Sequence, residues 1–322
     1  MQCDRCADDA VLHMAYSGAH LCESHLRYSI EKRVRRRIRE DSLLDPDTTP
    51  ADPETWVIGL SGGKDSAVLT DIVHRTFLDD PRVELVAVTI HEGIAGYRDE
   101  SLDACIELAD RLDITHHINT YEDEFGVRMD DIVEHDEATM AACAYCGVFR
   151  RDILERAAIE HSADKLLTGH NLDDEAQTAM MNFLSGDVTQ MAKHFEASLG
   201  AFDERRAQEA FIPRAKPLRD IPEREVALYA HLADLPVHFN ECPHSSEAFR
   251  GTIQELLYAL EDDHPGTRHS IMAGYEQLAS MAATKSTHEP REDLHHCGEC
   301  GSLTTGEQCR KCELLERFSA PA

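Results

Sequence analysis

The sequence predicts an α/β protein in which a domain with a parallel β-sheet lies between two small cysteine-rich modules. Between residues 54 and 285, short apolar segments alternate with segments whose apolar residues have helical spacing. A glycine-rich turn follows the first apolar segment, and Cys-x-x-Cys pairs occur near both ends of the 322-residue chain. We therefore divide the chain into residues 1–28, 29–53, 54–285 and 286–322.

The two N-terminal regions differ from the rest in composition. Residues 1–28 contain three cysteines and three histidines, which predicts a small loop-rich metal module. Residues 29–40, SIEKRVRRRIRE, predict a helix and form the most strongly basic run of the sequence. The segment LLDPDTTPADP (43–53) predicts an extended or flexible linker.

In the third region, apolar segments predict buried strands that alternate with helices, as in a parallel sheet covered on both faces. The predicted strands are 56–60, 84–90, 114–120 and 165–169, with a short strand at 237–239. The predicted helices are 66–77, 101–112 and 172–184, followed by a mostly helical stretch from about 220 to 285. A final unit over 297–312 is expected to consist of turns and cysteines.

The charge balance is strongly acidic, with 61 Asp and Glu against 32 Lys and Arg and a net charge of −29. Such a surface ordinarily disfavours nucleic acid. At molar salt, however, the Debye length falls to about 3 Å and long-range repulsion is screened. Because lysine is also scarce, we interpret the acidity as an adaptation to salt.

The beginning of the sequence has neither the basic nor the apolar segment of a signal peptide, and no apolar run is long enough for a bilayer. We expect a cytoplasmic protein with no membrane association. Its eleven cysteines are then reduced, which favours metal and catalytic chemistry over disulfides.

The glycine-rich turn is a candidate phosphate-binding loop. It comprises Ser61, Gly62, Gly63, Lys64, Asp65 and Ser66 and lies between a predicted strand and a predicted helix. Glycines let the backbone approach phosphate oxygens, and the helix N-terminus supplies free N–H groups. The Walker A spacing is absent, because Asp65 follows Lys64. SGGKDS instead resembles the loop of the PP-loop ATPases, which cleave ATP to AMP and pyrophosphate. The alternative is a glycine-rich turn without a ligand.

A second segment is expected at the same edge of the sheet. Gly169 to Asp174, GHNLDD, follows the fourth strand, and ligands of open α/β sheets bind at the carboxyl ends of the strands. The adjacent Asp173 and Asp174 suit Mg²⁺. Their alternative role is to stabilise the start of a helix through its dipole.

Two cysteine sets have the spacing of structural zinc sites. The first set is Cys3, Cys6, Cys22 and His25, and the second is Cys297, Cys300, Cys309 and Cys312. Each offers four ligands and no open position. We therefore expect two Zn²⁺ ions that stabilise small modules.

The remaining cysteines are Cys105, Cys143, Cys146 and Cys242. Cys105 lies among apolar residues of a predicted helix and is expected to be a packing residue. The other three are placed on loops at the sheet edge and allow three interpretations. They could hold a [4Fe–4S] cluster with one open iron, form a third zinc site with His244, or act as a redox pair between Cys242 and Cys143 or Cys146.

With SGGKDS, GHNLDD, CAYC, ECPH and the two flanking cysteine sets in this order, the chain resembles the TtuA/NcsA branch of tRNA 2-thiolation enzymes. The resemblance extends over nearly the whole chain. It implies a PP-loop ATPase domain of the adenine nucleotide alpha hydrolase-like (HUP) fold, flanked by N- and C-terminal zinc modules. It also places Cys143, Cys146 and Cys242 on a [4Fe–4S] cluster, with Cys143, Cys242 and Asp65 as catalytic residues.

The same resemblance implies the ATP contacts. They are Gly59, Leu60, Ser61, Gly62, Gly63, Lys64, Asp65, Ser66, Ile90, Arg150, Gly169 and Asp174. Ile90 is expected to face the adenine, before the turn HEGIAGYR. Arg150 stands where the family has a lysine that contacts ATP, which keeps the charge but changes its geometry.

The implied reaction begins when the loop orients ATP so that O2 of a uridine attacks the α-phosphorus, and sulfur then replaces AMP at C2. The implied partners are tRNA, a ubiquitin-like sulfur carrier with a C-terminal thiocarboxylate, its E1-like activating enzyme and a second copy of the chain. Competing interpretations are a PP-loop ligase that amidates an adenylated carbonyl, and a non-catalytic zinc protein that binds nucleic acid and senses ATP.

The basic helix is the best candidate for contact with tRNA phosphates. Its cations are Lys32, Arg33, Arg35, Arg36, Arg37 and Arg39. The alternative is a solvated helix face. The family branch contains enzymes for the anticodon wobble uridine and for the T-loop thymidine. A salt-adapted composition without the usual lysine-rich heat signature favours the wobble uridine.

Overall fold

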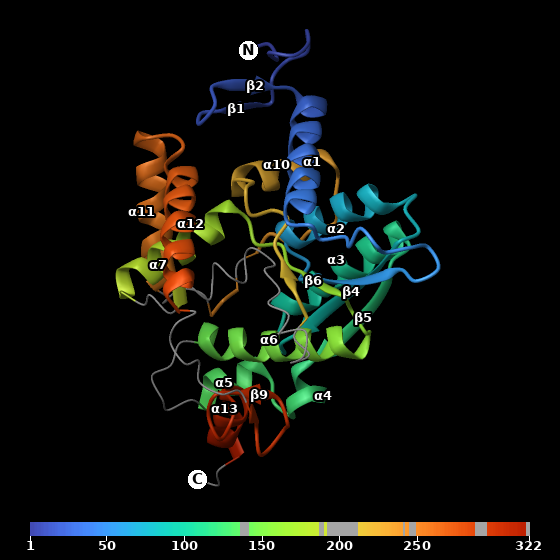
Figure 1. The fold of residues 1–322 in the computed structure, drawn as a ribbon, viewed down its shortest axis with the longest axis vertical. Coiled ribbons are helices and arrows are strands. Elements are labelled where there is room, and N and C mark those ends of the chain that lie inside the picture. Colours follow the sequence, from blue (N-terminus) through green and yellow to red (C-terminus); the bar gives the residue numbers. More distant parts are fainter. Residues whose placement is uncertain are drawn as a thin grey trace.

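A five-stranded parallel sheet forms the centre of the molecule (Figure 1), and its strands follow the order β5-β4-β3-β6-β7. They are β3 (Glu54–Gly59), β4 (Val83–His91), β5 (Thr115–Thr120), β6 (Lys165–Leu167) and β7 (Arg214–Ala215). The structure is a computed structural model that describes residues 1–135, 142–186, 190–191, 212–240, 242–244, 249–286 and 295–319. The parallel sheet with helices on its faces confirms the predicted fold class.

Side chains alternate between the two faces of β3, as the strand pleat requires. Trp56 and Ile58 pack with the helices of one face, whereas Val57 packs with Ala157 and Ala158 on the other. All five side chains are at most 4 % exposed, which explains why this strand appears in the sequence as a continuous apolar run.

Four helices cover the first face. They are α1 (Glu23–Glu40), α2 (Lys64–Phe77), α3 (Tyr97–Leu112) and α10 (Glu223–Leu232). In the basic helix α1, a stripe of apolar residues at four-residue spacing is buried, and it consists of Leu26, Ile30, Val34 and Ile38. This stripe packs α1 onto the first face of the domain.

The second face is covered by α6 (Ala142–Glu160), which crosses beneath the sheet in Figure 1. Short helices α4 (Tyr121–Phe125) and α5 (Met129–His135) and the C-terminal helix α13 (Arg310–Ser319) lie against it. Leu314 is fully buried in this cluster, and the rings of Tyr145 and Phe318 lie 5.6 Å apart.

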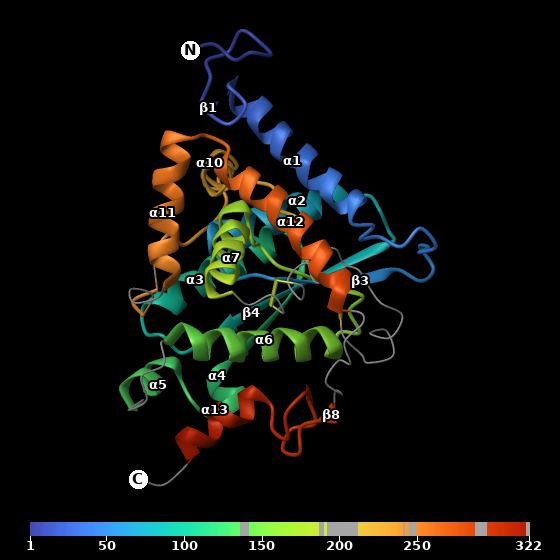
Figure 2. The ribbon, with the colours of Figure 1, turned by 60° about the vertical axis from the view of Figure 1, so that its left-hand side comes forward.

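A third group of helices lies beside the sheet and is seen in Figure 2. It consists of α7 (Leu172–Ser185), α11 (Phe249–Asp263) and α12 (Thr267–Ser286). Leu172, Ile253 and Tyr275 belong to the apolar cluster that joins the three helices.

The two cysteine-rich modules lie at opposite ends of the long axis of the molecule (Figure 1). The N-terminal module contains the hairpin of β1 (Leu12–Met14) and β2 (Ala19–Leu21). The C-terminal module contains β8 (His295–His296) paired with β9 (Leu303–Thr304).

The four main strands were predicted to within a few residues, but three expectations about other segments were wrong. Residues 237–239 are not a strand, and the short β7 completes the sheet instead. The basic helix begins at Glu23 and not at residue 29, because Cys22 ends the hairpin and starts the helix. The expected C-terminal turns lead into helix α13 from residue 310. Within the expected helical stretch, residues 241 and 245–248 lie outside the described residues. In the described part of the chain, no helix combines the length and apolarity needed to cross a membrane.

Candidate functional site

The predicted phosphate loop lies at the carboxyl end of the central strand. From β3 the chain continues to β4 and β5 on one side, and β6 pairs with β3 on the other side. The order of strands therefore reverses between β3 and β6, and ligands of open α/β sheets bind at such a switch point. The loops after these two strands contain the predicted SGGKDS and GHNLDD motifs.

Gly62 is required by the shape of this loop. Gly62 has φ +81°, and a Cβ there would lie 2.2 Å from the carbonyl oxygen of Ser101. Gly63 is the residue before α2, so the loop leads directly into the free N–H groups of the first turn. The Ser66 hydroxyl accepts a hydrogen bond from the Ser61 N–H at 3.1 Å and closes the loop. Such a loop suits an anionic group with several oxygens.

The loop after β6 is locked against the phosphate loop. A Cβ on Gly169 would lie 2.8 Å from the backbone carbon of Asp65, so only glycine allows this approach. The Asn171 amide donates to Asp65 Oδ1 at 2.9 Å, and its oxygen accepts from the N–H groups of Asp173 and Asp174. Asn171 thus connects the phosphate loop to the start of α7. Its cap position is visible in the sequence, but its contact with Asp65 is not.

Charged side chains surround the loop. Lys64 Nζ lies 3.0 Å from Asp65 and 2.8 Å from Glu223. Burial raises the pKa values of Asp65 and Asp174, and each of these carboxylates is further disfavoured by a neighbouring acid. A divalent cation would relieve this repulsion, so oxygen donors of the kind that Mg²⁺ prefers are present.

The ATP contacts expected at the ends of β3 and β4 are mostly buried. Gly59 ends β3, and Leu60 is 1 % exposed, with its N–H bonded to the Val88 carbonyl at 2.9 Å. Ile90 is 6 % exposed and belongs to the same apolar cluster as Ile94. Its expected contact with adenine would therefore fall to its backbone.

A buried ion network that the motifs did not predict lies between the loop and the central cysteines. The carboxylate of Glu92 is fully buried and is bonded to the guanidinium groups of Arg98 and Arg150. Arg98 also donates to the Ser61 carbonyl at 3.0 Å. Burial alone would raise the pKa of Glu92, but the two arginines lower it below its ordinary value. In the sequence, Glu92 is one acid of the HEGI segment, and its two partners lie 6 and 58 residues further along the chain.

The central cysteines come from two segments that lie side by side. Cys143 and Cys146 are in the first turns of α6, which corrects their expected placement on a loop before a helix. Cys143 is exposed, and its Sγ lies 3.9 Å from the carbonyl oxygen of His244. Cys146 and Cys242 are half-buried and pack against the same apolar cluster.

The surroundings of these thiols differ from those of Cys105. The Tyr121 hydroxyl lies 3.5 Å from Cys146 Sγ, and burial raises the pKa of this thiol while Arg150 opposes the rise. The His244 imidazole is bonded to Asp130 at 3.1 Å. Cys105 is fully buried on the opposite face of the sheet, where burial raises its pKa to about 11.

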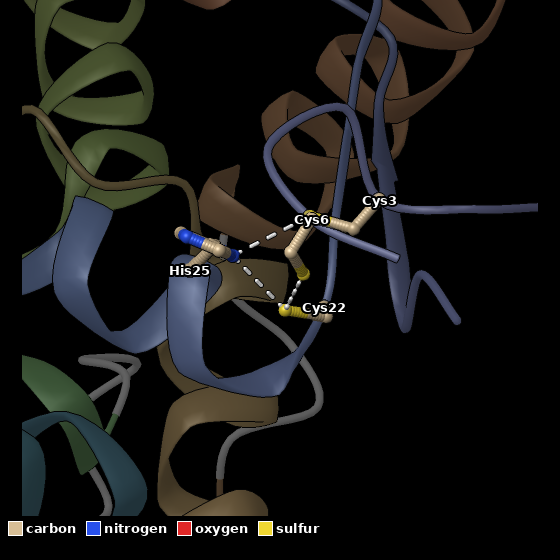
Figure 3. Close-up of side chains that lie close together, drawn as sticks. All are labelled: Cys3, Cys6, Cys22 and His25. Carbon is tan, nitrogen blue, oxygen red and sulfur yellow. Dashed lines mark hydrogen bonds between the residues drawn. The ribbon is translucent and has the colours of Figure 1, made fainter. Parts of the chain in front are cut away.

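The first predicted zinc set comes together in the structure (Figure 3). His25 Nδ1 lies 3.5 Å from Cys3 Sγ and 3.2 Å from Cys22 Sγ, and the sulfurs of Cys6 and Cys22 are 3.6 Å apart. Tetrahedral zinc, with bonds of about 2.3 Å to sulfur and about 2.0 Å to nitrogen, separates its ligand atoms by about 3.5–3.8 Å. The set therefore fits such an ion.

The second set also converges, with the Sγ atoms of Cys297, Cys300, Cys309 and Cys312 within 4.8 Å of one another. Cys300 and Cys309 are 3.5 Å apart, and the Cys309 N–H donates to Cys297 Sγ at 3.3 Å. Among the described residues, these two sets are the groups that could hold a metal ion at this spacing.

The six cations of the basic helix α1 differ in their surroundings. Arg33 is ion-paired with the buried Glu225, and Arg37 lies 2.6 Å from Asp220, so both hold α1 against the domain. Lys32, Arg36 and Arg39 are exposed on one face. Arg35 is half-buried and lies 3.4 Å from Glu31.

Comparison with known proteins places these features in a family. Residues 30–258 match the model of the PP-loop domain, and residues 2–27 match that of the 2-thiouridine synthetase TtuA N-terminal LIM domain. The chain is 68 % identical to the tRNA 2-thiolation protein NcsA of Haloferax volcanii, over 99 % of this chain and 100 % of that protein. The chain belongs to the PP-loop tRNA 2-thiolation family.

Two more distant members of the family are similar over most of their length. The cytoplasmic tRNA 2-thiolation protein 1 of Aspergillus niger is 34 % identical, over 98 % of this chain and 87 % of that protein. The solved structure of the U34-tRNA thiolase NcsA from Methanococcus maripaludis with its [4Fe–4S] cluster is 33 % identical. It superposes with a TM-score of 0.81 over 99 % of this chain and 96 % of that one. The resemblance inferred from the motifs is thus confirmed.

Proposed function

We propose that this protein uses ATP to replace O2 of a tRNA uridine with sulfur, as a tRNA sulfurtransferase. The observation that supports this most directly is a hydrogen-bonded network between the phosphate loop and the helix of the central cysteines. Through Arg98, Glu92 and Arg150, the phosphate loop is connected to the helix turn that contains Cys146. A nucleotide-activating loop and thiols that handle sulfur are the two parts that such a reaction needs.

The first step is adenylation of the uridine. Gly62, Gly63 and the first turn of α2 bind the phosphates through N–H groups, while Lys64 compensates their charge. Asp65 and Asp174 provide oxygen ligands for Mg²⁺. O2 of the uridine then attacks the α-phosphorus, pyrophosphate leaves, and the N3 proton is released. Positioning and electrostatic stabilisation supply the acceleration.

In the second step, sulfur at the oxidation level of sulfide attacks C2 and AMP departs with the oxygen, so no electrons are gained or lost. Cys143, Cys146 and Cys242 supply three thiolate ligands that suit a [4Fe–4S] cluster, which would offer an open iron for sulfide. The related structure from Methanococcus maripaludis carries such a cluster. Asp130 bonds to Nε2 of His244 and leaves Nδ1 for a metal, as in carboxylate–histidine–zinc sites, so a third zinc site completed by His244 is one alternative. A redox pair of Cys242 with Cys143 or Cys146 is the remaining alternative.

The wobble uridine is our proposed substrate position. The related thiolase from Methanococcus maripaludis is described as acting on U34, the wobble position of tRNA. The salt-adapted composition supports the same choice, because thiolation of the T-loop thymidine mainly protects tRNA against heat. Mapping of thiolated nucleosides in tRNA from a strain that lacks the protein tests this proposal. We expect loss of wobble 2-thiouridine, whereas loss confined to the T-loop would contradict the proposal.

The other expected components belong to the same proposal. They are two structural zinc ions, a thiocarboxylated ubiquitin-like carrier as sulfur donor with its E1-like enzyme, a homodimer and a cytoplasmic location. The cytoplasmic relative from Aspergillus niger supports the location.

Pyrophosphate release with and without tRNA separates the proposed enzyme from its competitors. A protein that only senses ATP should release none. A PP-loop ligase should release pyrophosphate but leave tRNA unthiolated, and it should remain colourless with intact zinc. We expect release that depends on tRNA and is accompanied by 2-thiouridine.

The central cysteines can be tested separately by anaerobic reconstitution. The wild type should turn brown, and its charge-transfer absorption should be lost in Cys143→Ser, Cys146→Ser or Cys242→Ser. Cys105→Ser is the control and should keep the absorption, because this thiol is buried on the other face. If iron is absent and His244→Ala behaves like the cysteine variants, the third-zinc interpretation is correct.

A further inference from the structure

We propose that Glu92 is a positioning residue of the thiolation reaction, which holds Arg150 beside Cys146 and Arg98 against the phosphate loop. This inference rests on the proposed function and names a residue that acts through its two arginine partners. The geometry of the Glu92 turn, the charge of the network and the free donors of Arg150 each support it.

The backbone fixes where the Glu92 carboxylate lies. The backbone carbonyl oxygen of Glu92 accepts a hydrogen bond from the Met129 N–H at 2.8 Å. The next residue, Gly93, has φ +73°, and a Cβ there would lie 2.8 Å from the Arg128 Cβ. The turn after β4 is therefore held against the start of α5, and Glu92 points into the interior.

The charges of the network do not cancel. One fully buried carboxylate lies between two guanidinium groups, which leaves one positive charge in excess. An isolated buried charge is costly, so the carboxylate is what allows Arg98 to remain 4 % exposed. Arg98 uses its remaining donors on the Ser61 carbonyl at 3.0 Å and the Ser101 hydroxyl at 3.2 Å. Both acceptors belong to the wall that shapes the phosphate loop.

The excess charge is accessible at Arg150. Its side chain is 41 % exposed, although its Nε is bonded to the buried Glu92. Among the described residues, its two terminal NH₂ groups make no hydrogen bond, so they remain available to a ligand. Arg150 follows Cys146 by one helical turn in α6. These donors are thus fixed between the thiol region and the loop, where the phosphate of an adenylated uridine would carry negative charge.

Replacing Glu92 with glutamine tests this arrangement. Glutamine keeps the size but loses the charge, and its NH₂ group would meet a guanidinium. We expect kcat/KM for tRNA-dependent pyrophosphate release to fall at least about tenfold, because Arg150 is no longer held. Glu92→Asp keeps the charge on a shorter side chain and should restore part of the rate.

The matched control is Glu225→Gln. Glu225 is also a buried carboxylate with two partners, Arg33 and the Tyr16 hydroxyl, and neither of these partners belongs to the phosphate loop or to α6. Both glutamine variants should lower the melting temperature, while only Glu92→Gln should lose pyrophosphate release. If the two variants lose similar stability and similar activity, the positioning role is wrong.

A double-mutant cycle separates positioning from general loosening. In an Arg150→Ala background, adding Glu92→Gln should cost less activity than it does in the wild type, because only the support of Arg98 is then lost. Fully additive losses would overturn the inference. If Glu92→Gln does not fold, the same comparison is made with Glu92→Asp. Absence of pyrophosphate release and thiolation in the wild type would instead contradict the proposed function, whatever the variants do.

Discussion

At the scale of single residues, the predicted phosphate loop depends on contacts that its motif does not reveal. Asp65 would be expected on the surface of a loop, yet it is bonded to Asn171 and Lys64 and its backbone is covered by Gly169. Burial raises the pKa of its carboxyl group, so the folded protein disfavours the charge that it holds there. A charge held against this cost is typical of a functional site.

We expect Asp65→Asn to abolish pyrophosphate release while the free energy of unfolding changes by only about 1 kcal/mol. The amide keeps the size of the side chain but removes the charge proposed to bind Mg²⁺. Asp79→Asn is the control, because Asp79 is exposed just beyond α2. Full activity of the Asp65 variant, measured beside its urea unfolding curve, would remove the assignment of the loop.

Site residues could be predicted from the sequence where they lie close together along the chain. SGGKDS and the paired Cys-x-x-Cys motifs are read within a few residues, and the structure brings each zinc set together as expected. The link of Glu92 to Arg98 and Arg150 could not be found this way. It joins the turn after β4 to α3 and α6, and only the folded chain brings those side chains into contact.

At the scale of elements, some cations of α1 hold the helix on the domain, and others are exposed and available to tRNA. Arg33 and Arg37 form ion pairs with Glu225 and Asp220, and the apolar stripe of α1 packs on the domain. Lys32, Arg36 and Arg39 remain exposed at i, i+4 and i+7, a spacing that places them on one helix face. The nearest acid to Arg36 is Glu40 at 3.7 Å, and an exposed pair of this kind is weak.

We expect the triple variant Lys32→Ala, Arg36→Ala and Arg39→Ala to weaken tRNA binding without loss of stability. The slope of log Kd against log salt should fall by about one for each phosphate contact removed. Filter binding at several salt concentrations measures it.

Arg33→Ala gives the opposite result and is the matched comparison. It leaves Glu225 buried without its cation and should destabilise the fold by about 3 kcal/mol. If the triple variant binds tRNA as the wild type does, with the same salt slope, α1 does not contact tRNA.

Elements with a clear pattern of apolar residues were predicted well, and elements without such a pattern were not. The strands β3 to β6 are short apolar runs bounded by turns, whereas the two residues of β7 are too few to give a pattern. Helix α6 was expected to begin after its cysteines. The apolar residues Tyr145, Phe149 and Ile153 recur every fourth residue and extend the helix back through Cys146.

At the scale of the whole molecule, two candidate metal modules lie at opposite ends of a domain that holds a third set of cysteines (Figure 1). We expect elemental analysis to find two zinc ions per chain, retained when iron is lost, because both four-ligand sets are closed. Cys6→Ser and Cys300→Ser should each lose one zinc, and Cys105→Ser neither. One zinc or none in the wild type would contradict this prediction.

The packing of α13 on α6 affects the order in which the protein can be completed during synthesis. Tyr145, between the two cysteines of α6, meets Phe318, and Lys311 lies 2.9 Å from Asp152 of the same helix. A ribosome releases α6 long before it releases α13. Until then, α6 lacks the contacts of α13, and the apolar side chains on that side of the helix are exposed. This side of the domain is therefore completed only after translation has delivered α13.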